Sequence, residues 1–141
     1  MRWPLALALI TCAAMAMQAC NAQPAAPPVR SYETGKLTIA GEGFAPSEIA
    51  DARAMPDVNK RVGIMVSLTP AGAKRLEGIT AALVGTPMLV ILDGKTLVAE
   101  LIRKPFAGGV IEIPGRWTLD EAEALARRIS GRDPLPDDLG M

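Results

Sequence analysis

PMLVILDGKTLVAELI, residues 87–102, consists of two apolar runs on either side of the dipeptide Asp93-Gly94. Asp-Gly accepts the positive φ angles of a two-residue turn, so apolar flanks around it predict a β-hairpin. Residues 88–92 are apolar at every position, which is typical of a strand that is covered on both faces or central in a sheet. We therefore place this hairpin in the middle of a sheet and expect the helices before and after it to cover one face.

The composition excludes several classes of function. The 141 residues suffice for one domain, and 15 basic residues balance 15 acidic ones, so no overall charge attracts nucleic acid. The chain has no histidine, and its cysteines, Cys12 and Cys20, both lie near the N-terminus. The rest of the chain therefore lacks the residues for a disulfide, a Cys/His zinc site or a Ser–His pair. We expect no enzyme, no cofactor, no metal site and no nucleic-acid partner.

The N-terminus has the pattern of a secretory signal peptide. Arg2 precedes an apolar run over residues 5–17, which is shorter than the roughly 20 residues needed to span a bilayer. A buried N-terminal helix of the folded domain is the alternative, but the Pro-rich residues 21–28 would separate such a helix from the core. We predict a signal peptide over residues 1–19.

The residues around Cys20 suggest a lipid anchor. Residues 17–20, Met-Gln-Ala-Cys, resemble the lipobox of bacterial lipoproteins, in which the cysteine is lipidated and becomes the new N-terminus. Ordinary cleavage after Ala22 is the alternative. By the same resemblance, Asn21 after the cysteine favours the outer membrane, and more than one acyl chain gives stable anchoring. Residues 20–35 include an Ala/Pro-rich stretch and are predicted to form a semi-rigid tether to a membrane.

Two further segments predict strands in the first half of the domain, which we place at residues 36–131. Residues 36–40 fit a short strand that the following glycines and Pro46 break. Residues 51–68 fit a hairpin, because apolar residues alternate along its second half. Pro56 cannot donate a hydrogen bond to a ladder, so its strand is predicted to lie at a sheet edge.

Two helices and a short strand complete the domain. Thr69-Pro70 supplies an N-cap and a first helical residue, and Gly85 ends this helix. Residues 118–121, Thr-Leu-Asp-Glu, form a capping box that starts a second helix, and Gly131 ends it. Between the helices we expect a strand over residues 110–113 that ends at Pro114-Gly115, and beyond the second helix a flexible tail over residues 132–141.

This order predicts an α+β fold. The short connections between strands imply a mostly antiparallel sheet, which we expect to contain about five strands. Two amphipathic helices imply one covered face of that sheet, so the predicted architecture is a two-layer sandwich.

The predicted contact surface is the polar loop that follows the hairpin. Arg103, Lys104 and Phe106 place two cations beside an aromatic ring, a combination that can bind an acidic or apolar partner. The alternative is a solvated loop whose Phe106 packs into the core. The exposed sheet face and the edge strands are a second option, because an extended peptide can add to a sheet edge.

Residues 47–129 resemble a known family in several motifs that occur in order. The head subdomain of the first periplasmic domain of SecD and SecDF, accessory subunits of the bacterial preprotein translocase, shows similar motifs at similar spacing. The motifs in this sequence are SEIADA (47–52), VSLTPAGAKRL (66–76), ITAALVG (79–85), LVILDGKTLVAELI (89–102) and FAGGVIEIPGRWTLDEAEALARRI (106–129). The sequence departs from the family at Val98-Ala99-Glu100, where the family often has a Ser-Ala-Pro-like sequence.

The resemblance implies a function in the cell envelope. The family head engages the emerging preprotein, so a similar domain is expected on the periplasmic side, binding an unfolded secreted polypeptide or an envelope protein. After the signal, no apolar run of this sequence approaches membrane length, so we expect a head module without the membrane motor, tethered by its own lipid. The alternatives are a small-molecule-binding or enzymatic reuse of the fold, and a structural or inhibitory module.

Overall fold

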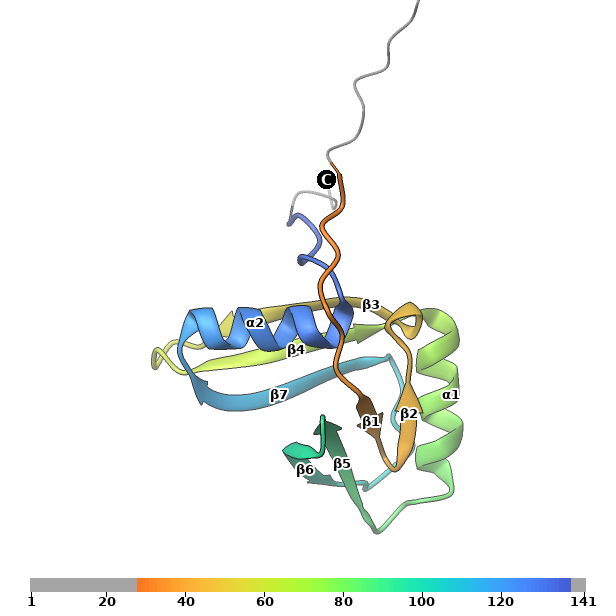
Figure 1. Cartoon of the computed structure of the whole chain (residues 1–141). Helices are drawn as coiled ribbons and strands as arrows, with labels where there is room; N and C mark the ends of the chain where they lie inside the picture. Colours follow the sequence, from red (N-terminus) through yellow and green to blue (C-terminus); the bar gives the residue numbers. More distant parts are fainter. Residues whose placement is uncertain (1–27, 138–141) are drawn as a thin grey trace, which may run out of the picture.

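The structure is a computed structural model that describes residues 28–137, and it contains two antiparallel sheets and two α-helices (Figure 1). The first sheet has four strands in the order β2-β1-β5-β6. Its strands are β1 (Leu37–Ile39), β2 (Glu42–Phe44), β5 (Pro87–Leu92) and β6 (Lys95–Leu101). The second sheet has three strands in the order β3-β4-β7. Its strands are β3 (Ile49–Pro56), β4 (Val62–Leu68) and β7 (Val110–Trp117).

The predicted α+β class and the antiparallel pairing are confirmed, but the expectation of one sheet of about five strands is corrected. The described part of the chain has seven strands in two sheets. The sheets separate because β5 pairs with β1, from the start of the domain, and does not pair with β4, which precedes it.

The β5–β6 hairpin forms as predicted, and its turn residues Asp93 and Gly94 have φ angles of 51° and 80°. Both angles are positive, as a type I′ turn requires. The predicted central position holds for β5 but is wrong for β6, which is an edge strand. A second turn with positive φ, at Ala40-Gly41, joins β1 to β2. Strand β2 was not predicted, because Ala-Gly lacks the Asn or Asp side chain that marks such turns in a sequence.

Strand β7 continues beyond the Pro114-Gly115 turn predicted from the sequence, so that prediction was wrong. A register shift between the pairs Val62–Trp117 and Ile64–Ile113 accommodates the extra residues as a β-bulge. Proline is tolerated there because β7 is an edge of the three-stranded sheet and needs no partner on its outer side.

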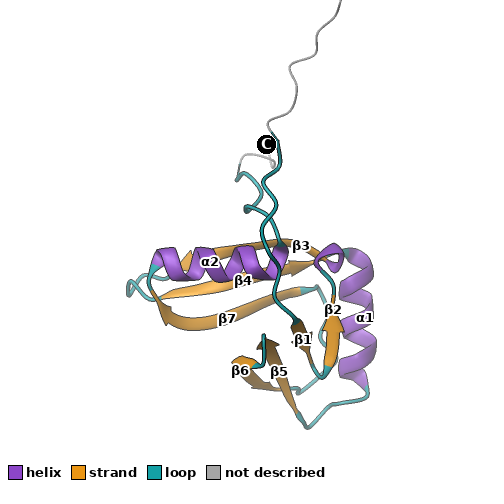
Figure 2. Cartoon of the chain, viewed as in Figure 1, coloured by secondary structure: helices purple, strands orange, loops and turns teal. Residues whose placement is uncertain are grey.

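The two helices take different positions (Figure 2). Helix α2 (Leu119–Ser130) lies across the three-stranded sheet, whereas α1 (Pro70–Ala81) stands beside β2 and the short 3₁₀ helix η1 (Pro46–Glu48). The predicted caps are present: the Thr69 hydroxyl accepts from the Gly72 N–H at 3.1 Å, and Thr118 and Glu121 form the capping box. The helices therefore start where the sequence predicts.

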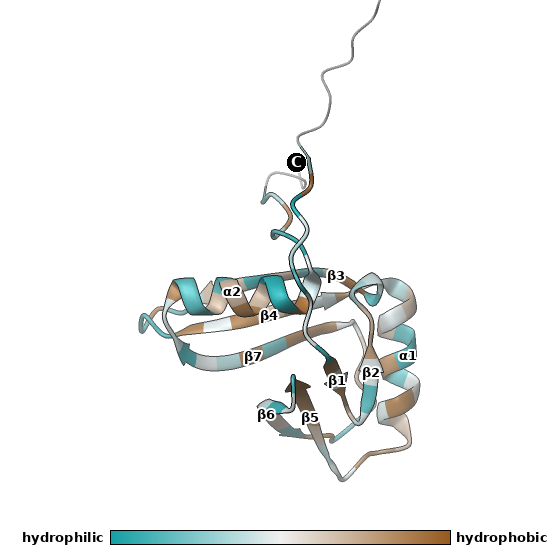
Figure 3. Ribbon diagram, in the orientation of Figure 1, coloured by the Kyte–Doolittle hydropathy of each residue, from teal (hydrophilic) through white to brown (hydrophobic). Residues whose placement is uncertain are grey.

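The core lies between the two sheets and the helices, and hydrophobic residues concentrate in the strands, above all in β1 and β5 (Figure 3). Both sheets and both helices contribute fully buried side chains. The largest of these are Ile39, Ile49, Ile64, Leu76, Ile113 and Ile129.

The two described ends of the chain run side by side and leave the domain on the same side (Figure 1). The Tyr32 N–H donates to the Gly131 carbonyl at 2.8 Å, and the Tyr32 hydroxyl donates to Asp133 at 2.9 Å. Beyond α2, the Leu135 N–H donates to the buried carboxylate of Asp51 in β3 at 2.9 Å. Residues 132–137 therefore lie along β3.

Candidate functional site

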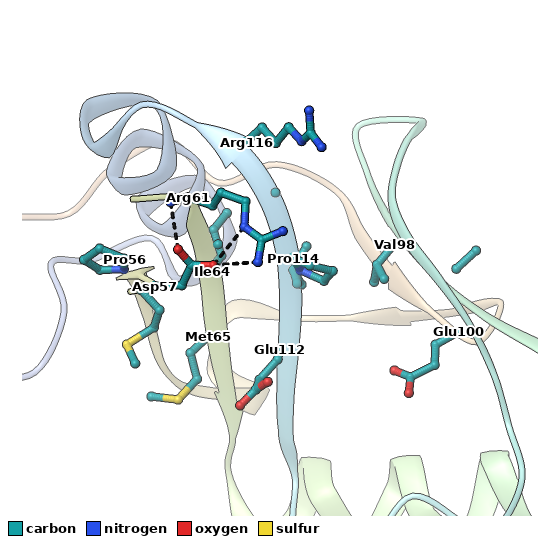
Figure 4. A pocket seen from close by; sticks show the side chains of 15 residues that line it. Pro56, Asp57, Arg61, Ile64, Met65, Val98, Glu100, Glu112, Pro114 and Arg116 are labelled. Atoms are coloured by element: carbon teal, nitrogen blue, oxygen red, sulfur yellow. Dashed lines mark hydrogen bonds and ion pairs between the residues drawn. The ribbon is translucent and has the colours of Figure 1, made fainter. Parts of the chain in front are cut away.

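A groove of about 800 Å³ lies between the two sheets, where β6 faces β7 (Figure 4). Val98, Ala99 and Glu100 of β6 form one wall. The opposite wall and the floor come from the three-stranded sheet and from the β3–β4 turn. These residues are Met55, Pro56, Asp57, Arg61, Gly63, Ile64, Met65, Glu112, Ile113, Pro114, Gly115 and Arg116.

Both walls of the groove belong to strands at the edges of their sheets. An edge strand directs half of its backbone N–H and C=O groups away from its own sheet, where another chain can pair with them. The β7 edge is interrupted by Pro114 and by the bulge. The β6 strand has no proline, and its own register shift lies between Thr96 and Val98, before the regular stretch from Val98 to Leu101. Backbone pairing is therefore favoured along β6.

The floor of the groove is apolar and adaptable. Met55 of β3 is 45% exposed, and Met65 of the neighbouring strand β4, which is labelled in Figure 4, is half-buried. Methionine side chains are flexible and polarisable, so they pack against apolar groups of different shapes. Such a floor can accommodate a varied set of apolar side chains.

One end of the groove is closed by the turn between β3 and β4. The Asp57 carboxylate accepts hydrogen bonds from the Arg61 backbone N–H at 2.9 Å and the Asn59 N–H at 2.7 Å, and it pairs with the Arg61 guanidinium at 2.9 Å. These donors, the Arg61 backbone N–H first, hold the pKa of Asp57 below its usual range. Asp57 is therefore charged, and its carboxylate stabilises the turn through these hydrogen bonds.

The charged residues farther along the groove have no such partners. Among residues 28–137, Glu100, Glu112 and Arg116 take part in no salt bridge. Figure 4 shows Glu100 and Glu112 on opposite walls and Arg116 on the β7 side. The groove thus combines an apolar floor with walls whose charges are available to a ligand.

The predicted contact residues Arg103, Lys104 and Phe106 line a second, smaller depression of about 290 Å³. Arg103 and Lys104 are exposed, whereas Phe106 is half-buried and packs against the core. Glu100 lines both depressions, so the two meet beside β6. The structure thus brings the predicted loop next to the groove, and its role in binding stays a prediction.

The loop is held in place by a buried hydroxyl on α1. The Phe106 N–H donates to the Thr80 oxygen at 2.8 Å, and the Thr80 hydroxyl donates to the Leu76 carbonyl at 2.8 Å. Thr80 is fully buried, so it is a positioning residue for the loop.

Sequence reasoning missed the groove itself. In the sequence, Met65 lies between the alternating apolar residues of its strand and Glu112 lies within a short apolar strand, and neither position is marked as part of a site. The predicted lipidation site, Cys20, lies outside the described residues.

Within residues 28–137, no group of three or more His, Cys, Asp or Glu side chains is placed to hold a metal ion. In the same range, no helix is long and apolar enough to cross a membrane.

The sequence matches an established domain family over most of its length. Residues 33–131 match the family described as SecDF, P1 head subdomain. The protein translocase subunit SecDF of Thermus thermophilus is 33% identical over 116 residues, which cover 78% of this chain and 16% of that protein. The protein translocase subunit SecD of Dictyoglomus turgidum is 33% identical over 105 residues, which cover 74% of this chain and 25% of that protein.

Solved structures show the same fold. A structure of SecDF, described as a membrane component that enhances protein export, matches with a TM-score of 0.58 and 32% identity, over 66% of this chain and 42% of that chain. A second structure, of SecDF in a super-membrane-facing form, matches with a TM-score of 0.57 and 32% identity, over 68% of this chain and 13% of that chain. The chain therefore spans less than half of the length of each of these relatives.

Proposed function

Because this chain belongs to the SecDF P1 head subdomain family, we propose that it is a non-catalytic domain of the cell envelope that binds unfolded secreted polypeptide in support of protein export. The family was expected from the sequence motifs, and the match over residues 33–131 confirms that part of the prediction. The function of whole SecD and SecDF proteins extends to this chain only as a proposal, since the chain matches a small part of them.

The observation that carries the proposal is the open groove beside β6. An unfolded polypeptide presents apolar side chains and unpaired backbone groups together. The groove offers partners for both, because its floor contains Met55 and Met65 and its wall is an edge strand. A volume of about 800 Å³ accommodates several residues of an extended chain.

The location we propose is the periplasmic side of the envelope, with a lipid on Cys20 as the anchor. The described chain enters from Pro28 on the side where the C-terminal residues also leave, and the β5–β6 hairpin lies at the far side (Figure 1). A membrane anchor at Cys20 would then leave β6 facing away from the anchored end.

The test is site-specific photo-crosslinking in the native host. A photoreactive amino acid at Val98, on the groove wall, is compared with one at Lys74, which is exposed on α1 outside the groove. We expect adducts with secreted precursors from position 98 only. Equal labelling from both positions, or no precursor among the adducts of position 98, would overturn the proposal.

Small-molecule binding is the second candidate, and the groove volume is the observation that favours it, because ligand pockets commonly measure about 300–1,000 Å³. Thermal-shift screening with a metabolite library distinguishes the candidates. A stabilising metabolite that also blocks crosslinking from position 98 would favour the second candidate.

A further inference from the structure

We propose that the polypeptide binds as an added strand, pairing with β6 to extend the sheet β2-β1-β5-β6 by one strand. This inference rests on the proposed function and adds to it the binding mode and the class of segment that binds. The direction of the β6 backbone groups supports it, as do the open space beside them, the condition of the other strand edges and the side chains on each sheet face.

The free backbone groups of β6 belong to Ala99 and Leu101. In an antiparallel ladder, each residue directs its N–H and C=O to one side, and successive residues alternate between sides. The Ile102 N–H donates to the Thr86 carbonyl at 2.9 Å, and the Ile102 carbonyl accepts from Gly85 at 2.8 Å, so Ile102 faces β5. By alternation Val98 and Glu100 also face β5, whereas Ala99 and Leu101 face away from it.

A hydrogen bond on the far side of β5 supports this assignment independently. Leu89 lies opposite Ala99 in the ladder, and its carbonyl accepts from the Ala40 N–H of the adjoining β1 segment at 2.9 Å. Leu89 therefore faces β1, which leaves Ala99 without a backbone partner in β5.

The space beside these groups is open along the strand. The larger groove is lined by Val98, Ala99 and Glu100, and the smaller depression by residues 100–107. Together they follow β6 from Val98 to the loop that carries Arg103 and Lys104. An extended chain advances roughly 3.3 Å per residue, so the four residues from Val98 to Leu101 define an edge of about 10–13 Å.

Each of the other strand edges in the described domain is partly covered or is interrupted. The Arg132 guanidinium donates to the Ile49 and Ala50 carbonyls, which occupies the start of the β3 edge. On β2, the Gly43 carbonyl accepts from the Arg75 guanidinium at 3.0 Å. The β7 edge carries Pro114 and the bulge. Residues 98–101 of β6 contain no proline, and within the described residues no side chain donates a hydrogen bond to their carbonyls, so this edge is free where it borders the groove.

The side chains beside β6 indicate which segments fit. Leu101 is 51% exposed and Leu89 is 37% exposed on the outer sheet face, whereas Val98 and Met65 line the groove on the other. An added strand would therefore meet apolar surface on both faces, which suits a run of consecutive apolar residues. Glu100 and Glu112 at the groove disfavour acidic residues in that run.

The test uses a fluorescein-labelled peptide, Lys-Lys-Val-Leu-Val-Leu-Val-Lys-Lys, and two analogues that carry N-methyl groups on alternate residues of the apolar run. The two methylation patterns block opposite edges of the peptide strand. We expect one pattern to weaken binding to the protein about tenfold or more, because it removes at least two hydrogen bonds, and the other to have little effect. Equal affinities for both patterns would overturn strand addition while leaving polypeptide binding intact.

A pair of variants tests the edge from the side of the protein. Ala99→Pro removes the N–H that faces away from β5, and Ala99→Val keeps it as a control. We expect about a tenfold loss of affinity for Ala99→Pro only. If Ala99→Pro fails to fold, the methylated peptides decide alone. If the unmodified peptide does not bind the wild-type protein, both this inference and the proposed function are refuted.

Discussion

Gly109 tests how closely α1 packs against the start of β7. The residue has a φ of +67°, and its carbonyl accepts from the Leu68 N–H at 2.7 Å. A Cβ atom added to Gly109 would lie 2.5 Å from the Ala73 Cβ on α1. Gly108, with a φ of +92°, is the matched control, because a Cβ added there meets no atom within 4 Å.

The magnitudes follow from two separate effects. A positive φ destabilises a residue with a side chain by about 1–2 kcal/mol, which applies to both positions. The contact with Ala73 adds about 1–3 kcal/mol for overpacking at Gly109 alone. We therefore expect Gly108→Ala to lower the free energy of unfolding by about 1–2 kcal/mol and Gly109→Ala by about 2–5 kcal/mol.

The double variant Ala73→Gly/Gly109→Ala isolates the contact. Glycine in a helix interior is less stable than alanine by about 1 kcal/mol, but here it removes the opposing Cβ. We expect the double variant to be more stable than the sum of the single effects by about 1–3 kcal/mol. Urea unfolding followed by circular dichroism gives the free energies of unfolding of the wild type, Ala73→Gly, Gly109→Ala and the double variant, and of Gly108→Ala as the control. Equal losses at both glycines, or additive effects in the double variant, would refute the proposed packing.

Three further predictions concern the Thr80 hydroxyl, the Asp93 carboxylate and the C-terminal residues. Thr80→Val removes the acceptor of the Phe106 N–H and should destabilise the protein by about 1–3 kcal/mol. Thr80→Ser keeps the hydroxyl and should retain most of the stability in the same urea assay. The pKa of Asp93 lies below its usual range because its carboxylate accepts from the Lys36 N–H and the Arg128 guanidinium. This stabilisation is present above the unfolded-state pKa of about 3.9 and is lost as the pH falls through the lower folded-state pKa. Asp93→Asn should therefore weaken the acid dependence of the melting temperature below about pH 4. An unchanged dependence of the melting temperature on pH would contradict this. Removing residues 132–141 frees the Ile49 and Ala50 carbonyls at the start of the β3 edge and should produce dimers or aggregates in light scattering, and a stable monomer would contradict that reasoning.

The local elements were largely predictable because their signals are local. Asp93-Gly94, Thr69-Pro70 and the capping box at Thr118 act through their own backbone neighbours, so each starts or turns an element wherever the rest of the chain lies. The predictions that the structure corrected depend on contacts between distant segments. Pro114-Gly115 has the composition of a turn, but the pairing of β7 with β4 keeps it within a strand.

The candidate site was less predictable than the fold. Arg103, Lys104 and Phe106 were selected for their chemistry in one loop, and they line only the smaller depression. The larger groove brings together residues about 40 positions apart, such as Met55 and Val98, and no local pattern marks them as neighbours.

The α+β class, the antiparallel hairpins and the helix starts follow from the amino-acid sequence, since they depend on turn chemistry, caps and periodicity. The family follows from the resemblance of its ordered motifs. The division of the strands into two sheets and the edge position of β6 became known from the structure alone. The physical reason is that strand order depends on contacts between distant segments. The β5 strand pairs with β1, which lies about 50 residues earlier, and leaves the outer side of β6 open to the groove.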